Sequence, residues 1–224
     1  MSRHCYLATY RPLIRSRFGR EASERHGLLP FIDGSCRREP DFESPFPSIT
    51  ATCRGANFAP RLKADDLVLY MTVRGRYLGD HEPGWRLVAV LRMIERFESH
   101  MAAAEWYRAR GCALPSNCIV PENPPKPFHL TNGNPPKEVK LRVVCERNPE
   151  AAVRLWDATY RKRITDSPMF LACKAEFLEL RSPPQVHKSD LLDIFGRVPS
   201  TLNPPRILCN QLDRLLTSVR SRCV

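Results

Sequence analysis

Apolar residues recur along this chain at two spacings, and the two kinds of segment alternate. Continuous apolar runs, such as 67–73 and 87–94, are typical of strands buried at the centre of a sheet. Spacings of three and four residues, as in 99–110, are typical of helices with one apolar face. The pattern therefore predicts an α+β protein rather than an all-helical or all-strand one.

The pattern also sets the expected elements. Strands are expected at 5–10, 48–53, 67–73, 87–94, 139–145 and 170–180. Helices are expected at 99–110, 149–164, 190–195 and 207–220, with a loop or short helix at 15–27. Ser99 is a suitable N-cap, Pro149 fits a first helical turn, and Gly111 and Gly196 are suitable stops. The glycine-bearing segment 74–84 suits a hairpin-like connection.

Prolines gather in two segments between these elements. The chain has 21 prolines, and they are dense in 30–48 and in 115–136, so we expect two long ordered loops. Loops of this length usually shape a binding or catalytic site. We expect residues 1–136 to form a binding core and residues 137–224 to add strands and helices that pack on it in the same domain.

The charge balance narrows the class of partner. The chain of 224 residues carries 35 Lys and Arg against 24 Asp and Glu, for a formal net charge of +11. Arginine dominates the basic residues, and its planar fork matches phosphate oxygens and base edges. A nucleic acid or a nucleotide is the expected partner. The alternative is a basic surface that only keeps the protein in solution.

Cysteine usage and the absence of familiar motifs exclude several classes. The nine cysteines include no Cys-x-x-Cys pair, so we expect free thiols, no disulfide and no bound zinc or other metal. The chain opens with no secretory signal and holds no long apolar segment, which predicts a cytoplasmic protein without a membrane partner. It has no Walker A, Gly-x-Gly-x-x-Gly or Gly-x-Ser-x-Gly motif, and no cofactor is expected.

Candidate ligand-binding residues concentrate between residues 31 and 92. Arginines that could hold phosphates are Arg37, Arg38, Arg54, Arg61, Arg74 and Arg76. Hydroxyl groups that could read a base edge include those of Thr52 and Thr72, on strands that could line one cavity with Thr50. Tyr77 and Trp85 are candidates for stacking on a base, and Asn117 for bonding an adenine-like edge.

Each of these candidates also has a structural reading. The arginines could pair with neighbouring carboxylates such as Glu39 and Asp41, threonine is a common strand residue, and asparagine is a common turn residue. The aromatic side chains could simply pack in the core. The sequence alone leaves both readings open.

Two segments carry a family resemblance. The strand Asp66-Leu-Val-Leu-Tyr70, followed by Arg86-Leu-Val-Ala-Val-Leu91, resembles a strand pair of PUA-like barrels, including the EVE, ASCH and YTH branches. Ala89 takes the position of a small residue in that pattern. Asp65-Asp66 departs from it, because a Gly-Asp turn is usual there. The resemblance covers roughly residues 48–94 and implies a PUA-like mixed β-barrel with flanking helices.

A second resemblance concerns the proline-rich loops. Asp33-Gly-Ser-Cys-Arg-Arg-Glu-Pro40, with Ile49-Thr-Ala-Thr-Cys-Arg54, Phe58-Ala-Pro-Arg-Leu62 and Leu114-Pro-Ser-Asn-Cys118, is similar to nucleotide modification associated domains. These are predicted PUA-like modules linked with modified DNA bases in phages and bacteria. The resemblance implies that the protein recognises or processes a modified base or nucleotide.

Three functions remain open on the sequence. The first is a protein that binds nucleic acid or a modified nucleotide through arginine-rich turns and a pocket of aromatic and hydroxyl groups. The second is an enzyme on the same scaffold, a hydrolase or transferase acting on a modified base or nucleotide, although no catalytic residue can be assigned. The third is an interaction protein whose charge is incidental.

Overall fold

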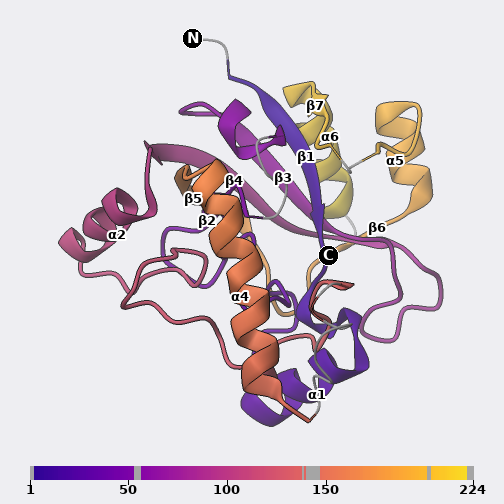
Figure 1. Ribbon diagram of the computed structural model, residues 1–224. Helices are drawn as coiled ribbons and strands as arrows, with labels where there is room; N and C mark the ends of the chain where they lie inside the picture. The colour runs from indigo at the N-terminus through magenta and orange to yellow at the C-terminus, as the bar shows by residue number, and fades with distance from the viewer. Residues whose placement is uncertain (1–2, 53–56, 138, 140–146, 201–202, 221–224) are drawn as a thin grey trace.

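The computed structural model describes residues 3–52, 57–137, 139, 147–200 and 203–220, and its elements form a mixed sheet with helices and long loops around it (Figure 1). The strands are β1 (Cys5–Tyr10), β2 (Ser48–Thr50), β3 (Leu67–Thr72), β4 (Trp85–Phe97), β5 (Phe170–Leu178), β6 (Gln185–Val186) and β7 (Arg206–Ile207). The α-helices are α1 (Arg17–His26), α2 (His100–Ala109), α4 (Pro149–Asp166), α5 (Lys188–Phe195) and α6 (Cys209–Arg220). This arrangement confirms the α+β class.

The sheet follows the order β2-β5-β4-β3-β1-β7, with β6 paired to β4. Strands β1 and β3 run parallel, and the other described pairs are antiparallel. This path is open at both ends among the described strands, so the structure shows a mixed sheet and leaves the closed barrel as an expectation. Strand β5 lies between β2 and β4, so residues on both sides of position 136 build one sheet.

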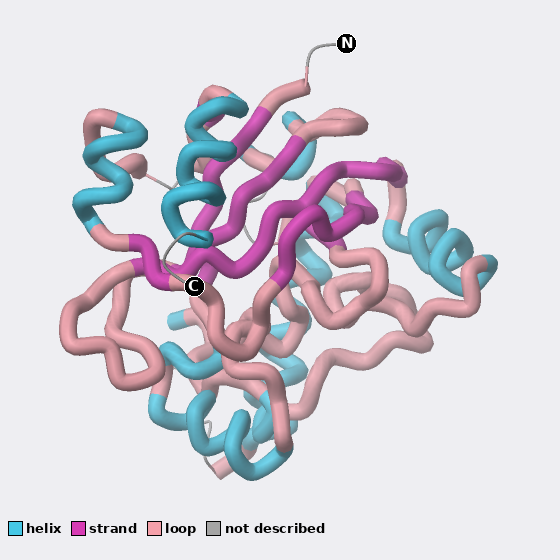
Figure 2. The backbone as a smooth tube through the Cα atoms, turned by 180° about the vertical axis from the view of Figure 1, so that it is seen from behind, coloured by secondary structure: helices cyan, strands magenta, loops and turns pink. Residues whose placement is uncertain are grey.

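The two faces of the sheet are covered differently. Alternate residues of β1 point to opposite faces, so Leu7 packs with Leu191 of α5 and Leu215 of α6, while Ala8 packs with Phe31 and Phe42 from a long loop. We call these the helix-covered face and the loop-covered face. Figures 1 and 2 show α5 and α6 on one side of the sheet, and α1, α4 and the long loops on the other.

Most of the expected elements are present. Helix α2 begins after Ser99, whose hydroxyl accepts a hydrogen bond from the Ala102 backbone N–H, and α4 has Pro149 in its first turn. Gly75 and Gly84 form an antiparallel bridge in the connection between β3 and β4. The last helix begins at Cys209 rather than at 207, because Ile207 pairs with Cys5 in the sheet. The strand expected at 139–145 lies almost wholly outside the described residues.

The expectation that all cysteines are free is wrong for one pair. Cys5 and Cys209 form a disulfide, with their Cα atoms 5.5 Å apart. Their sequence separation of 204 hid this pair from spacing arguments. The pairing of β1 with β7 brings the two residues together, because Ile207 is the partner of Cys5 and Cys209 follows two residues later. Cys36, Cys112, Cys118 and Cys173 are free thiols, while Cys53, Cys145 and Cys223 lie outside the described residues.

Within the described ranges, every helix is too short or too polar to span a bilayer.

Candidate functional site

The loop that precedes β2 is buried although it is rich in charge. The side chain of Arg37 is 0% exposed. Its Nε donates to Asp157 of α4 at 2.6 Å, and its Nη1 donates to the carbonyl oxygens of Ser116 and Asn123 at 3.0 and 2.8 Å. One guanidinium therefore joins the two proline-rich loops to α4.

The neighbouring Arg38 has a similar position. Its Nε donates to Glu43 at 2.8 Å, its Nη2 donates to the Leu130 carbonyl at 3.0 Å, and its Nη1 donates to the Asp33 carbonyl. Arg37 and Arg38 were expected to hold phosphates at an exposed turn, but both lie inside the protein with internal partners. The physical reason is that loop carbonyls lack a strand or helix ladder, so buried ones need side-chain donors.

A buried carboxylate, Glu39, follows the two arginines. Its Oε2 accepts hydrogen bonds from Thr50 Oγ1, Thr52 Oγ1 and Asn117 Nδ2, at 2.6, 3.1 and 3.0 Å. Its Oε1 accepts from the Thr50 backbone N–H at 2.9 Å. The structure thus brings together Thr52 and Asn117, two residues singled out in the sequence, and their shared partner is a carboxylate.

Burial changes the acidity of this loop. Desolvation raises the pKa of Glu39 from 4.5 to about 7, although the hydrogen bonds from Thr50, Asn117 and Thr52 act in the opposite direction. Desolvation likewise raises the pKa of Asp33 from 3.8 to about 6. A carboxyl group with a pKa near neutrality can accept a hydrogen bond when ionised and can exchange a proton with a bound molecule.

Glu39 lies at a narrow cavity on the loop-covered face. The residues that line the cavity are Thr9, Tyr10, Glu39, Pro40, Ile49, Thr50, Phe58 and Tyr70. About one water molecule fits in it. Three of the lining residues are aromatic, and the rings of Tyr10 and Tyr70 meet edge to face with centroids 6.3 Å apart. The cavity therefore places one buried carboxyl group among aromatic walls.

A second cavity, of about 370 Å³, is basic. Its lining residues are Arg11, Arg15, Ser16, Val73, Arg74, Asn132 and Asn134. We call it the basic pocket. The three arginines are exposed, and within the described residues they form no ion pair. Three uncompensated guanidinium groups around one cavity attract an anion.

The topology explains why these arginines meet. Arg11 directly follows β1, and Arg74 lies two residues beyond β3. The two strands are parallel neighbours, and the Val73 backbone N–H donates to the Tyr10 carbonyl at 2.8 Å, so both chains leave the sheet at the same edge. In open sheets with parallel strands, ligands bind outside the carboxyl ends of those strands. The basic pocket occupies that position.

Trp85 and Thr72 flank the connection between β3 and β4. The Trp85 ring is half-buried, and the Arg74 guanidinium lies 5.7 Å from its centroid. Thr72 is buried, and its hydroxyl accepts a hydrogen bond from the Arg86 backbone N–H at 2.9 Å rather than facing Thr50 and Thr52. Trp85 therefore lies beside the basic pocket. Thr72 instead joins the end of β3 to the start of β4 through its hydrogen bond with Arg86.

The remaining candidates are spread over the surface and the core. Tyr77 is buried against Phe31, with ring centroids 5.8 Å apart, and it donates to the Val73 carbonyl at 2.6 Å. Arg76 is exposed, and Arg61 is exposed with its guanidinium 5.9 Å from the Tyr6 ring centroid. Arg54 lies outside the described residues.

Sequence reasoning missed three charged residues of these cavities as ligand contacts: Arg11, Arg15 and Glu39. Arg11 had a signal, since it directly follows an apolar strand. Glu39 was considered only as a surface partner for arginines, and one of its hydrogen-bond donors, Asn117, is 78 residues away in the sequence.

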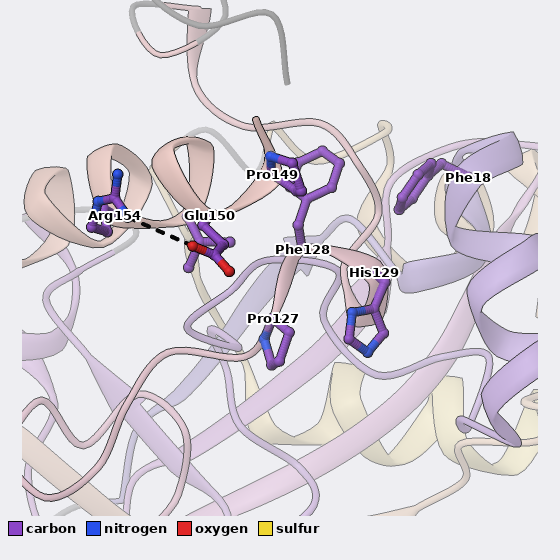
Figure 3. Close-up of a pocket in the computed structure, with 8 residues that line it drawn as sticks. Phe18, Pro127, Phe128, His129, Pro149, Glu150 and Arg154 are labelled. Atoms are coloured by element: carbon purple, nitrogen blue, oxygen red, sulfur yellow. Dashed lines mark ion pairs between the residues drawn. The ribbon is translucent and has the colours of Figure 1, made fainter. Parts of the chain in front are cut away.

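A third cavity is mainly apolar and lies between α1, the short helix at Phe128–Leu130, and α4 (Figure 3). Phe18, Phe128, Pro149 and Val153 form its apolar walls. Figure 3 shows Glu150 and Arg154 on α4, where they form an ion pair at 4.0 Å. Its charged groups compensate each other, so this cavity lacks the charge excess of the basic pocket.

Comparison with protein-family models, curated proteins and solved structures gave no match, so the functional argument rests on the geometry of these sites.

Proposed function

We propose that this protein binds a nucleic acid or a nucleotide and holds a phosphate group in the basic pocket. The observation that carries the proposal is the set of three arginines, Arg11, Arg15 and Arg74, which have no ion-pair partner among the described residues and lie at the carboxyl ends of two parallel strands. Guanidinium groups bind phosphate oxygens through paired, charge-assisted hydrogen bonds. Trp85, which lies against Arg74, is placed to stack on a base beside that phosphate.

The proposal includes a modified base and a PUA-like scaffold, both drawn from the sequence resemblance. One feature of the sheet supports it: Tyr70 of β3 pairs directly with Ala89 of β4, so the aromatic residue and the small residue of the resembling pattern are cross-strand neighbours. The role proposed is recognition of a base in a DNA-modification context, with no cofactor.

A salt titration tests the proposal. Labelled single-stranded DNA, duplex DNA, RNA and nucleotides are titrated with the protein at low salt, and fluorescence anisotropy reports binding. Affinity should fall steeply as salt rises, because phosphate binding releases counterions. Arg11→Ala and Arg74→Ala should each weaken binding by about 1–3 kcal/mol. Arg197→Ala, an exposed arginine beyond α5, is the matched control and should bind as the parent does. Absence of binding to every ligand at low salt would falsify the proposal.

The second candidate function is a hydrolase or transferase acting on a modified base or nucleotide. The buried Glu39 favours it, since a carboxyl group with a pKa of about 7 is suited to general acid–base catalysis. Incubation with nucleotides and modified nucleosides, followed by mass spectrometry, distinguishes the two functions. A product that forms with the parent protein and not with Glu39→Gln supports the enzyme, and unchanged ligands support a binding protein.

A further inference from the structure

The cavity at Glu39 has an acceptor position that the described residues leave open. Each carboxylate oxygen can accept about two hydrogen bonds. Oε2 is filled by three donors, whereas Oε1 accepts, among the described residues, only from the Thr50 backbone N–H. Oε1 therefore has room for one more donor, and Glu39 lines a cavity where a donor could enter.

The size and walls of the cavity limit what can enter. About one water molecule fits, so the cavity admits a single small group rather than a whole ring. The aromatic side chains of Tyr10, Phe58 and Tyr70 form much of the wall, so the group that enters must fit between rings. An exocyclic amino group at the edge of a base is small enough and can donate an N–H to Oε1.

The cavity and the basic pocket are built on the same two strands. Tyr10 lines the cavity and Arg11 lines the basic pocket, and likewise Tyr70 lines the cavity and Val73 lines the pocket. Three residues of extended chain span about 10 Å. The two sites are thus one to three residues apart along these strands, and one nucleotide would have to span them, with its phosphate in the pocket and its base at the cavity.

We infer that the Glu39 cavity is a base-reading site that selects nucleobases carrying an exocyclic amino group, such as cytosine, over bases with a carbonyl group at that position. The inference rests on the proposed function, because it assumes that a phosphate in the basic pocket brings the base to the cavity. The ionised carboxylate accepts the amino N–H at Oε1 and repels a carbonyl oxygen placed there.

The test compares two ligands that differ at this one position. The nucleotides dCMP and dUMP share the same sugar and phosphate, and position 4 of the ring carries an amino group in dCMP and a carbonyl group in dUMP. Calorimetric titration at low salt and pH 8 should show that the parent protein binds dCMP about tenfold more tightly or better, as expected for a hydrogen bond to a charged acceptor.

Glu39→Gln is the informative variant. The amide oxygen takes the Oε2 position, where three donors converge, and the amide nitrogen replaces Oε1, which loses the hydrogen bond from the Thr50 backbone N–H. The cavity then offers a donor, so the preference for dCMP should disappear or reverse towards dUMP. Glu95→Gln, on an exposed part of β4, removes the same charge elsewhere and should keep the parent preference.

A second measurement needs no mutation, and it tests the inference even if Glu39→Gln does not fold. The parent's dCMP-to-dUMP affinity ratio should be larger at pH 8 than at pH 6, on either side of the Glu39 pKa of about 7, because only the ionised carboxylate repels a carbonyl. The surrounding titratable or charged groups are Asp33, Tyr10, Tyr70, Cys173 and Arg163. Effects on the shared phosphate cancel in the ratio.

The outcomes separate the inference from the proposed function. A preference for dCMP that is lost in Glu39→Gln and kept in Glu95→Gln supports the inference. Equal binding of dCMP and dUMP by the parent, a preference unchanged in a folded Glu39→Gln, or an affinity ratio that does not change with pH overturns it and leaves phosphate binding in place. If inorganic phosphate and both nucleotides fail to bind the parent, the proposed function fails as well.

Discussion

The two faces of the sheet differ in what stabilises the segments that cover them. The helix-covered face packs Leu7, Leu69 and Val90 against apolar residues of α5 and α6. The loop-covered face also has an apolar core, but most of the buried polar residues of the described chain lie in the loops above it and in β2. Helices satisfy their own backbone groups, whereas loops need side-chain partners when they are buried. The loop-covered face therefore carries internal charges, and with them the Glu39 cavity.

The largest effect should come from removing the internal charge that joins the loops to α4. Arg37→Ala leaves the carbonyl oxygens of Ser116 and Asn123 without their donor and deprives Asp157 of its fully buried partner. The free energy of unfolding should fall by about 3–5 kcal/mol.

Denaturant unfolding measures this change. Arg154→Ala, on an exposed part of the same helix, is the control and should change stability by under about 1 kcal/mol. If Arg37→Ala were as stable as the control, the loops would not depend on these hydrogen bonds. The loop-covered face would then not be held together by internal charges.

The second effect concerns the helix-covered face, which the Cys5–Cys209 disulfide ties to β1. Reduction should lower the free energy of unfolding by about 2–4 kcal/mol, because it releases a long cross-linked segment of the unfolded chain. Hydrogen exchange should speed up in α6 and not in the loop around Arg37. The double variant Cys5→Ala/Cys209→Ala should not respond to reductant. No change in stability, with mass spectrometry showing that the thiols are reduced, would count against a structural role for this bond.

The third effect is a pH dependence that arises on the loop-covered face. The folded protein holds a proton on Glu39 up to a pKa of about 7, whereas the unfolded chain releases it near the ordinary value of 4.5. The folded state holds the Glu39 proton between these values, so the contribution of Glu39 to the free energy of unfolding falls as pH rises from 4.5 through 7. The loss should be on the order of 1–3 kcal/mol.

Glu39→Gln should remove this contribution, as measured by the difference between the unfolding free energies of parent and variant at a series of pH values. Asp33, whose pKa is about 6, acts in the same direction and remains in the variant. Burial raises the pKa values of Tyr10 and Cys173 well above their ordinary values, so these two groups titrate outside the range. Burial lowers the pKa of His100 from 6.5 to about 4, so the unfolded chain holds this proton in the same range and His100 acts in the opposite direction, in the parent and in the variant alike. A profile unchanged in the variant would mean that Glu39 is not the group responsible.

The smallest effect on stability should come from the basic pocket. Arg74 is exposed and contacts the Trp85 ring at 5.7 Å, so Arg74→Ala should lower the free energy of unfolding by about 0.5–1 kcal/mol. Thermal melting measures it, and the same sample serves for the binding titration. A variant that unfolds would show Arg74 to be structural, like Arg37, and would remove the contrast between internal and exposed arginines.

Arg61 stays a predicted ligand contact, and so does Arg54, which lies outside the described residues. Arg61 is exposed, with a long hydrogen bond of 3.4 Å to the Asn57 carbonyl, and nothing in its contacts excludes a ligand. Arg61→Ala should therefore weaken binding by about 1–3 kcal/mol if it contacts a phosphate, with little change in melting temperature.

How far the candidate site could be read from the sequence depended on distance along the chain. Thr52 and Asn117 were selected separately, and they do converge, but on Glu39, which had been assigned to the surface. Arg37 and Arg38 could not be told from Arg11 by residue type. The difference lies in their partners: Asp157 is 120 residues from Arg37, and the Leu130 carbonyl is 92 residues from Arg38.

The sequence by itself determined the α+β class, most of the helix and strand positions and the two long loops, because periodicity, caps and prolines act within a few residues. Only the tertiary structure decided which charges are internal, that Cys5 meets Cys209, and that Arg11 and Arg74 share one pocket. These outcomes depend on parallel pairing of β1 with β3 and on the placement of β5 and β7 in the sheet. Such pairings join distant segments, so no local pattern encodes them.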